Sequence, residues 1–271
     1  MPRLASMTDR WGVITGASSG IGAEFARQLA ARGMHLVLVA RREELMRSLS
    51  EELHRLHGTR TEIIAMDLTA ENSIQQIASR VEQAGIEIDL LVNSAGFGMV
   101  GEILETDSNR IRQMLRLNIE ALTALTYHFL PAMIQRNRGG VLNVASLAAF
   151  QPVAYMGAYA ASKAYVLHFS EALHAELSET GVVVMALCPG VTQTDFFDVA
   201  GATGWLQKHS SQTPEEVVRK AIVTMDKGRQ YVVPGWRNYL LTCLVRIGTR
   251  WRVVNESKRF FRPRRPKKTE K

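Results

Sequence analysis

The sequence predicts an α/β fold, a doubly wound parallel sheet of seven strands with helices on both faces. Short apolar segments alternate with helical segments along most of the 271 residues, as in chains that form parallel sheets. The apolar segments are rich in Val, Ile and Leu without polar alternation, which is typical of strands buried on both sides. A glycine-rich turn also joins the first strand to the first helix.

The predicted strands occur in seven places along the chain. They span 12–15, 35–40, 62–66, 90–93, 141–145, 182–188 and 231–234. The first helix is predicted over 23–32. Capping signals predict later helix starts over 69–72, at Thr106-Asp107 and at Thr213-Pro214-Glu215-Glu216. A chain of this length that is 46% hydrophobic can bury one α/β core. We therefore predict an N-terminal extension over 1–10, one domain over 11–234 and a C-terminal tail over 235–271.

Several functional classes receive no support from the composition. The two cysteines, Cys188 and Cys243, offer no disulfide framework, and no Cys or His cluster has the spacing of metal ligands. The first seven residues lack the apolar core of a signal peptide. No segment approaches the ~20 apolar residues of a spanning helix. We therefore expect a cytoplasmic protein without a metal site.

The turn after the first predicted strand reads Gly16-Ala17-Ser18-Ser19-Gly20-Ile21-Gly22. A strand, a glycine turn and a helix in this order present backbone N–H groups and a helix N-terminus to a pyrophosphate. Gly16 would make the tight turn, Gly20 would admit the phosphates and Gly22 would let helix and strand pack closely. We expect these glycines, with Ser18, Ser19 and Ile21, to bind a dinucleotide.

The end of the second predicted strand indicates which dinucleotide is bound. An NAD site usually has Asp or Glu there for the ribose hydroxyls, but this chain has Arg41 and Arg42. Guanidinium groups can hold a 2′-phosphate through charge-assisted hydrogen bonds. The sequence thus favours NADP, with Arg41 as the main contact. Arg42 either flanks the adenine or begins a solvated helix.

Tyr159 and Lys163 are four residues apart on a predicted helix and share one face. A nearby cation favours an ionised phenol, so Lys163 should lower the pKa of Tyr159. Such a phenol could exchange a proton with a carbonyl or alcohol oxygen. By itself a Tyr–Lys pair could equally be an ordinary surface pair.

Taken together, the glycine turn and the Tyr159-x-x-x-Lys163 pair resemble the short-chain dehydrogenase/reductase family, which has a Rossmann fold. Further matches occur in the family's order between residues 11 and 234. They are Asn93-Ser94-Ala95-Gly96, Asn118 within Leu117-Asn118-Ile119, Ser146 thirteen positions before Tyr159, and Pro189-Gly190-Val191-Thr192-Gln193-Thr194. Two departures are Ser94 in place of a second Asn and Ser19 where many NADP-using relatives have a basic residue.

The resemblance implies roles for these residues. Tyr159 would be the proton donor, Ser146 would bind the substrate oxygen, and Lys163 would bind the nicotinamide ribose. Asn118 would kink its helix and position a water in a proton relay. Val191 and Thr194 would anchor the carboxamide. The other cofactor contacts implied are Asp67, at the adenine, and Asn93, Ala95, Gly96, Pro189 and Gly190.

The segments expected to line the substrate pocket are apolar and aromatic. This suits a lipophilic ketone or secondary alcohol, although half of these side chains could simply pack a lid over 195–212 against the core. The chosen substrate contacts are Phe97, Ser146, Phe150, Met156, Tyr159 and Phe197, and Trp205 and Leu206 belong to the same apolar set.

The tail over 235–271 is apolar with interspersed arginines and has a densely basic end over 258–268. Such a segment can lie on an anionic membrane surface, so a peripheral membrane contact is one expectation. Packing on its own core or on another subunit is the alternative. Nucleic acid binding is not favoured because no recognisable nucleic-acid-binding fold is present. The resemblance also implies a homo-oligomer, paired through helices over 119–135 and 157–180.

The sequence therefore predicts an NADP(H)-dependent oxidoreductase of a lipophilic ketone or secondary alcohol. The alternative is a protein of the same fold that binds NADP(H) without catalysis and regulates an interaction through its tail. The complete set of Ser146, Tyr159 and Lys163 argues against this alternative.

Overall fold

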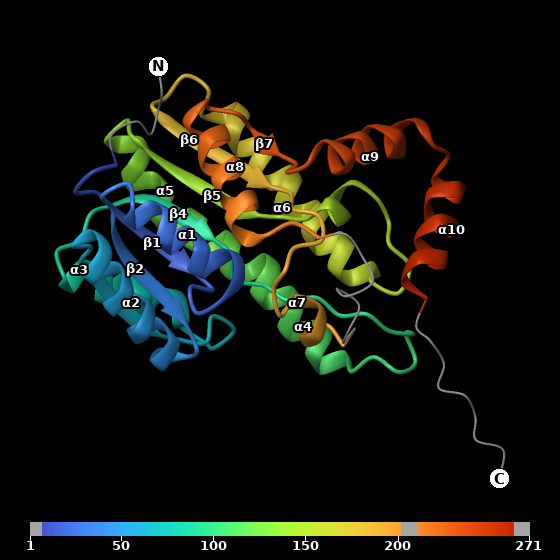
Figure 1. Cartoon of the computed structure of the whole chain (residues 1–271), viewed down its shortest axis with the longest axis horizontal. Helices are drawn as coiled ribbons and strands as arrows, with labels where there is room; N and C mark the ends of the chain where they lie inside the picture. Colours follow the sequence, from blue (N-terminus) through green and yellow to red (C-terminus); the bar gives the residue numbers. More distant parts are fainter. Residues whose placement is uncertain (1–6, 202–210, 263–271) are drawn as a thin grey trace, which may run out of the picture.

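The computed structural model, which describes residues 7–201 and 211–262, contains one seven-stranded sheet between two layers of helices (Figure 1). The strand order is β3-β2-β1-β4-β5-β6-β7, and all neighbours are parallel. The strands are β1 (Trp11–Thr15), β2 (His35–Ala40), β3 (Thr61–Ala65), β4 (Ile88–Asn93), β5 (Gly139–Val144), β6 (Val182–Leu187) and β7 (Tyr231–Val232). This confirms the predicted fold class, and every strand end lies within two residues of its prediction.

Helices cover both faces of the sheet because alternate strand residues point to opposite sides. One apolar core joins the sheet to α1 (Gly20–Ala30), α2 (Glu43–His57) and α8 (Pro214–Asp226). The other joins it to α3 (Ser73–Gln83), α5 (Leu122–Gln135) and α6 (Gly157–Glu176). None of the helices in the described ranges is long and apolar enough to cross a bilayer.

The predicted helix starts had different outcomes. Thr213 caps α8 in a complete capping box with Glu216. Asp107 caps α4 (Ser108–Leu115) by accepting a hydrogen bond from the backbone N–H of Asn109. The start over 69–72 is misplaced at Thr69, which bonds back to Asp67, because α3 begins at Ser73 with Asn72, the last residue of that segment, as its N-cap residue. The first helix begins at Gly20, three residues before its predicted start.

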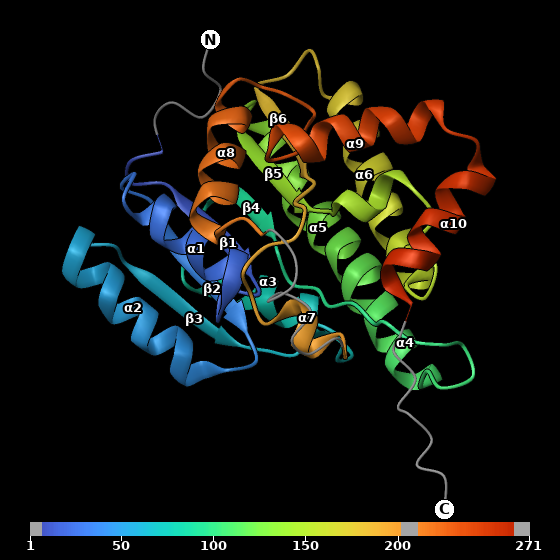
Figure 2. The ribbon, with the colours of Figure 1, turned by 45° about the vertical axis from the view of Figure 1, so that its right-hand side comes forward.

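The chain beyond β7 forms two further helices, α9 (Trp236–Ile247) and α10 (Arg250–Phe261). Figures 1 and 2 show α9 leaving the end of the sheet beyond β7, and α10 turning back alongside the molecule. The Oγ of Ser257 on α10 accepts a hydrogen bond from the backbone N–H of Ala154 at 3.0 Å. Phe261 packs on a buried cluster that includes Met156 and Tyr159. The helix pair therefore packs on the segment that precedes Tyr159.

Candidate active site

A cavity of about 1580 Å³ runs along the edge of the sheet where the strands end. Its lining includes the residues that directly follow β1, β2, β3, β4 and β5, and Pro189, which comes two residues after β6. In doubly wound sheets ligands bind at this edge, where the strand order reverses. Here the reversal falls between β1 and β4, and Thr15 at the end of β1 pairs with Val39 on β2 and Asn93 on β4.

The glycine turn forms the floor of one end of this cavity. Gly16 has φ +68°, and a Cβ on it would lie 3.0 Å from the backbone of Ala95. A Cβ on Gly22 would lie 2.3 Å from the carbonyl oxygen of Gly16. Thr15 Oγ1 accepts hydrogen bonds from the N–H groups of Ser94 and Ala95, so the β4 loop is held against the turn. Only glycine fits at 16 and 22, and this tight turn fits a pyrophosphate at the N-terminus of α1.

Two arginines and one carboxylate lie beside the glycine turn. The Arg42 guanidinium donates to Ser18 Oγ at 3.2 Å and to Ser19 Oγ at 2.7 Å. Arg41 also lines the cavity and is exposed. Arg42 therefore folds back over the turn, and it is also the exposed N-cap residue of α2, so it begins a helix as one of the two alternatives expected. Asp67 lines the cavity too, with Oδ1 accepting from the backbone and hydroxyl of Thr69.

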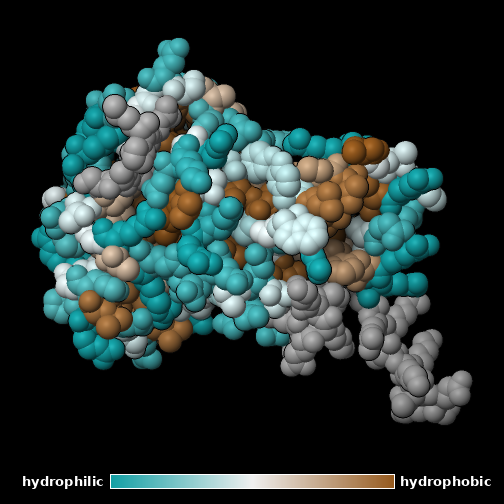
Figure 3. All heavy atoms as spheres, turned by 45° about the horizontal axis from the view of Figure 1, so that its top comes forward, coloured by the Kyte–Doolittle hydropathy of each residue, from teal (hydrophilic) through white to brown (hydrophobic). Residues whose placement is uncertain are grey.

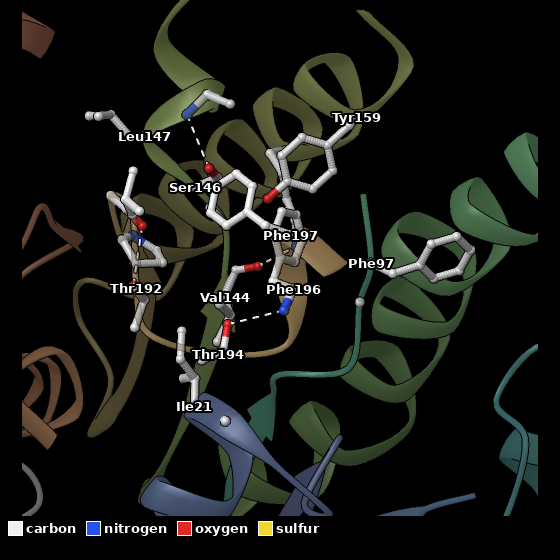
Figure 4. A pocket seen from close by; sticks show the side chains of 18 of the residues that line it. Ile21, Phe97, Val144, Ser146, Leu147, Tyr159, Thr192, Thr194, Phe196 and Phe197 are labelled. Atoms are coloured by element: carbon white, nitrogen blue, oxygen red, sulfur yellow. Dashed lines mark hydrogen bonds between the residues drawn. The ribbon is translucent and has the colours of Figure 1, made fainter. Parts of the chain in front are cut away.

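Ser146, Tyr159 and Lys163 meet in the middle of the cavity, where Figure 4 shows the Ser146 and Tyr159 hydroxyls facing the same space. Ser146 follows β5, and its Oγ accepts from the N–H of Ala148 at 3.1 Å. Lys163 lies one turn after Tyr159 on α6 and donates to the carbonyl oxygen of Val144 at 2.8 Å. Its Nζ is 5.9 Å from the centre of the Tyr159 ring.

Burial controls the ionisation of this pair. It raises the pKa of Tyr159 to about 12, although the hydrogen bond with Ser146 acts in the opposite direction. It also lowers the pKa of Lys163 to about 8. The expectation that Lys163 lowers the phenol pKa is therefore wrong for this structure. Removing the phenolate from water raises the pKa of Tyr159 by more than the hydrogen bond with Ser146 lowers it.

Asn118 lies in a π-helical segment, η1 (Arg116–Ala121), between α4 and α5. Its Oδ1 accepts from the N–H of Phe97 at 3.2 Å, and its Nδ2 donates to Phe97 O and Ser162 Oγ. The irregular helix agrees with the predicted kink. The side chain is fully buried and positions Phe97 and α6, while the predicted water relay stays a prediction.

Three predicted site residues lie outside the cavity lining, namely Asn118, described above, Asn93 and Phe150. Asn93 is buried and donates to Asn143 Oδ1 at 2.9 Å and to Thr126 Oγ1 at 3.2 Å. Its side chain thus joins β4 to β5 and α5 instead of facing a cofactor. Phe150, at the end of the 3-10 helix η2 (Leu147–Phe150), packs on Tyr231 with ring centres 6.0 Å apart. The prediction that Phe150 contacts substrate is therefore wrong, because the η2 turn directs this ring toward β7.

The other predicted positions within the described residues line the cavity. Their set comprises Gly16, Ser18, Ser19, Gly20, Ile21, Gly22, Arg41, Arg42, Asp67, Ala95, Gly96, Phe97, Ser146, Met156, Tyr159, Lys163, Pro189, Gly190, Val191, Thr194 and Phe197. Trp205 and Leu206 lie outside the described residues. Phe196, on the short helix α7 (Phe196–Val199), packs on the Tyr159 ring at 5.3 Å.

The tail supplies a wall that sequence reasoning missed. Trp236, Leu241 and Leu244 on α9 and Ser257 and Phe260 on α10 line the cavity. Helical spacing could have shown that Arg237, Leu241 and Leu244, which all line the cavity, share one face of a helix. It could not have shown that this face turns toward Tyr159.

A sequence model of the short chain dehydrogenase family matches residues 10–203. The chain belongs to the short-chain dehydrogenase family. A curated member, the very-long-chain 3-oxoacyl-CoA reductase of Macaca fascicularis, is 33% identical over 219 residues, which are 79% of this chain and 68% of the relative. The 7beta-hydroxysteroid dehydrogenase of Mediterraneibacter gnavus is 30% identical over 84% of this chain and 87% of its own.

Solved structures of short-chain dehydrogenases share the whole architecture. The enzyme of Sphingobium yanoikuyae, solved in complex with NADPH, superposes with a TM-score of 0.79 and is 29% identical. The alignment covers 97% of this chain and 98% of that one. This short-chain dehydrogenase is thus an oxidoreductase that acts on CH–OH or C=O groups.

Proposed function

We propose that this short-chain dehydrogenase reduces a lipophilic ketone to a secondary alcohol with NADPH, and that Tyr159 is the proton donor. The observation that carries the proposal is the meeting of Ser146, Tyr159 and Lys163 in one cavity that is continuous with the glycine turn. Ser146 comes from the turn after β5, Tyr159 and Lys163 come from α6, and the glycine turn comes from the start of the chain. A protein that only bound nucleotide would have no chemical need for all three.

The cofactor is NADP(H), since structural relatives were solved with NADPH and the turn has basic side chains beside it. Arg41 is the proposed partner of the 2′-phosphate because its guanidinium is exposed at the cavity. Arg42 supports the same charge from the turn itself, through Ser18 and Ser19. NADPH supplies the hydride that reaches the carbonyl carbon.

The remaining steps belong to side chains. Ser146 donates a hydrogen bond to the ketone oxygen and stabilises the negative charge that develops on it. Tyr159 then transfers its phenolic proton to this oxygen as the C–O double bond becomes single. Lys163 holds the nicotinamide ribose beside Tyr159 and faces the phenolate that forms. The products are the secondary alcohol and NADP⁺, so protons and electrons balance.

The phenol of Tyr159 is in the protonation state that reduction needs. Burial raises its pKa to about 12, so it carries its proton at neutral pH. Reduction of a ketone uses this proton, whereas oxidation of an alcohol needs a phenolate to accept one. The protonation state therefore agrees with the proposed direction.

The substrate end of the cavity supports a lipophilic ketone. Apolar side chains surround Tyr159, among them Phe97, Met156, Phe196 and Phe197. Two curated relatives carry names of enzymes for 3-oxoacyl-CoA and for hydroxysteroids. Both groups of substrates present a carbonyl or alcohol on a large hydrocarbon body. We propose that the substrate of this chain belongs to that broad class.

The test is turnover of hydrophobic ketones by Tyr159→Phe, with NADPH oxidation as the readout. We expect turnover to fall by about 10²–10⁴-fold, the usual contribution of a general acid. NADPH affinity, measured by titration, should change little because the ring still packs on Phe196. Tyr155→Phe is the matched control, since Tyr155 does not line the cavity. Normal turnover by Tyr159→Phe would overturn the assignment. NADPH binding without turnover by the wild type would favour the regulatory alternative.

We also propose homo-oligomer formation through α5 and α6. Tyr127 on α5 and Tyr165 on α6 are 66% and 38% exposed, and both rings stack on Phe169. Exposed stacked rings of this kind are suited to an interface. Contact of the tail with an anionic membrane is the other proposed association.

A further inference from the structure

Exposed apolar side chains gather on α9 and α10. Among the described residues eighteen large hydrophobic side chains are exposed, and nine of them belong to these two helices. The nine are Trp236, Tyr239, Leu240, Leu241, Leu244, Ile247, Trp251, Val254 and Phe260. Figure 3 shows hydrophobic residues clustered at the end of the molecule where these helices lie, with hydrophilic residues beside them. Soluble monomers rarely expose a large apolar patch without a partner.

The same segment concentrates positive charge. Residues 235–271 contain twelve Lys and Arg against two Glu, whereas the rest of the chain has 21 Lys and Arg against 24 Asp and Glu. The body is therefore net negative and the tail strongly positive. On the two helices, Arg259 pairs with Glu256 at 2.9 Å, while Arg246 and Arg250 have no ion pair within the described residues. Basic groups around an apolar face match an anionic bilayer, which attracts Lys and Arg side chains near its surface.

The apolar surface and the cavity share a border. Trp236, Leu241, Leu244 and Phe260 are exposed, and they also line the cavity. The part of the lining that α9 and α10 supply also has polar members, namely Arg237, Asn238, Arg252, Glu256 and Arg259. The mouth that we infer between the two helices therefore combines an apolar path along Trp236, Leu244 and Phe260 with basic groups that suit an anionic surface.

The opposite face of the helix pair is fixed to the domain. Asn238 donates to Gln212 Oε1 at 3.1 Å, and Gln212 exchanges backbone hydrogen bonds with Val191 and Gln193. Ser257 and Phe261 hold α10 as described above. One face of the α9–α10 pair therefore packs on the core, as one of the alternatives for the tail expected, and the other face is exposed.

From this juxtaposition we propose that α9 and α10 lie on an anionic bilayer and that the ketone enters the cavity from the bilayer through this mouth. The inference rests on the proposed function for the class of substrate. A lipid dissolved in the bilayer then reaches Tyr159 between Trp236, Leu244 and Phe260 without passing through water. The exposed face of the helix pair makes the contact with the bilayer, and the basic end of the tail adds electrostatic attraction to the anionic bilayer surface.

The first test locates the surface that meets the bilayer. Vesicles of phosphatidylcholine and phosphatidylserine with brominated acyl chains quench tryptophans that enter the hydrocarbon region. We expect Trp236→Phe and Trp251→Phe each to reduce the quenching, while Trp11→Phe, on β1, leaves it unchanged. Quenching that is unaffected by both tail substitutions would overturn the proposal. Failure of the full chain to sediment with these vesicles would overturn it as well.

The second test concerns the entry route and uses Ile247→Asp/Trp251→Asp, because neither residue lines the cavity. With a long-chain methyl ketone dissolved in the vesicles, we expect turnover to fall about tenfold, as for a loss of about 1.4 kcal/mol of membrane affinity. Turnover of a short water-soluble methyl ketone should stay unchanged. The matched control is Leu45→Asp/Leu56→Asp, two exposed leucines on α2, which should behave as the wild type.

Three results separate the explanations. Unchanged turnover of the bilayer ketone by the Ile247→Asp/Trp251→Asp variant would overturn the entry route. Equal losses in this variant and the α2 control would also overturn it, since charge alone would then explain the effect. Absence of turnover with either ketone in the wild type would overturn the proposed function, and the quenching test would still decide how the helices meet the bilayer.

Discussion

At the cofactor end of the cavity the backbone positions the site, whereas at the substrate end side chains from distant segments do so. The glycine turn lies against the β4 loop, and a methyl group added at Gly22 would collide with the carbonyl oxygen of Gly16. The substrate end is bordered by α9 and α10, which rest on the Asn238 and Ser257 hydrogen bonds and on packing by Phe261.

Because of this difference, the two ends of the cavity should tolerate different amino-acid substitutions. A backbone cradle recognises phosphates, which all dinucleotides share, and leaves little room for substitution. A wall of apolar side chains recognises size and hydrophobicity, and it can be changed without disturbing the sheet. The two ends should therefore respond differently to substitutions of similar size.

The largest effect is expected at Gly22. Gly22→Ala would place a Cβ 2.3 Å from the carbonyl oxygen of Gly16, so the turn must shift. We expect a loss of about 3 kcal/mol in the free energy of unfolding, at the upper end for overpacking, and much weaker NADPH binding. Urea unfolding and calorimetric titration measure the two quantities. Gly157→Ala is the control, because its Cβ meets nothing within 4 Å in the first turn of α6. Similar behaviour of the two variants would show that the turn is not a rigid cradle.

An intermediate effect is expected at the two arginines, and it should differ between them. Arg41→Ala should weaken NADPH binding by about 10- to 100-fold, as for loss of a charged hydrogen bond worth 1.5–3 kcal/mol, and should spare NADH. Arg42→Ala should weaken both nucleotides, because Arg42 also holds Ser18 and Ser19 in the turn. Titration of both variants with NADPH and NADH measures this. Tighter binding of NADH than NADPH by the wild type would contradict the assignment of both residues.

The smallest effect is expected at Ser257, at the substrate end. Ser257→Ala removes the acceptor for the N–H of Ala154 and should cost about 1 kcal/mol. We expect a severalfold rise in KM for a hydrophobic ketone with unchanged NADPH affinity, because the substitution loosens the wall and leaves the cradle intact. Ser48→Ala, whose hydroxyl bonds to the exposed helix backbone of α2, is the control. A loss of NADPH affinity in Ser257→Ala would show that the two ends are not independent.

The sequence by itself determined the parts of this protein that depend on neighbours along the chain. Unalternated apolar segments predicted all seven strands because a parallel sheet is buried on both faces. The glycine turn could be predicted because its strand, turn and helix are contiguous in the sequence. The Tyr159–Lys163 pair could be predicted because helical spacing brings the two side chains onto one face. The helix start over 69–72 was misplaced on the same local scale, since Thr69 bonds to Asp67 instead of capping α3.

Only the tertiary structure decided what depends on burial and on distant contacts. It raised the pKa of Tyr159, because desolvation outweighs the hydrogen bond with Ser146, and it directed the ammonium of Lys163 to the carbonyl oxygen of Val144. It turned Phe150 toward Tyr231 and Asn93 toward Asn143. It also brought the tail, more than seventy residues after Tyr159, to the mouth of the cavity. Local spacing fixes which residues share a face, but the packing of one element on another decides what that face meets.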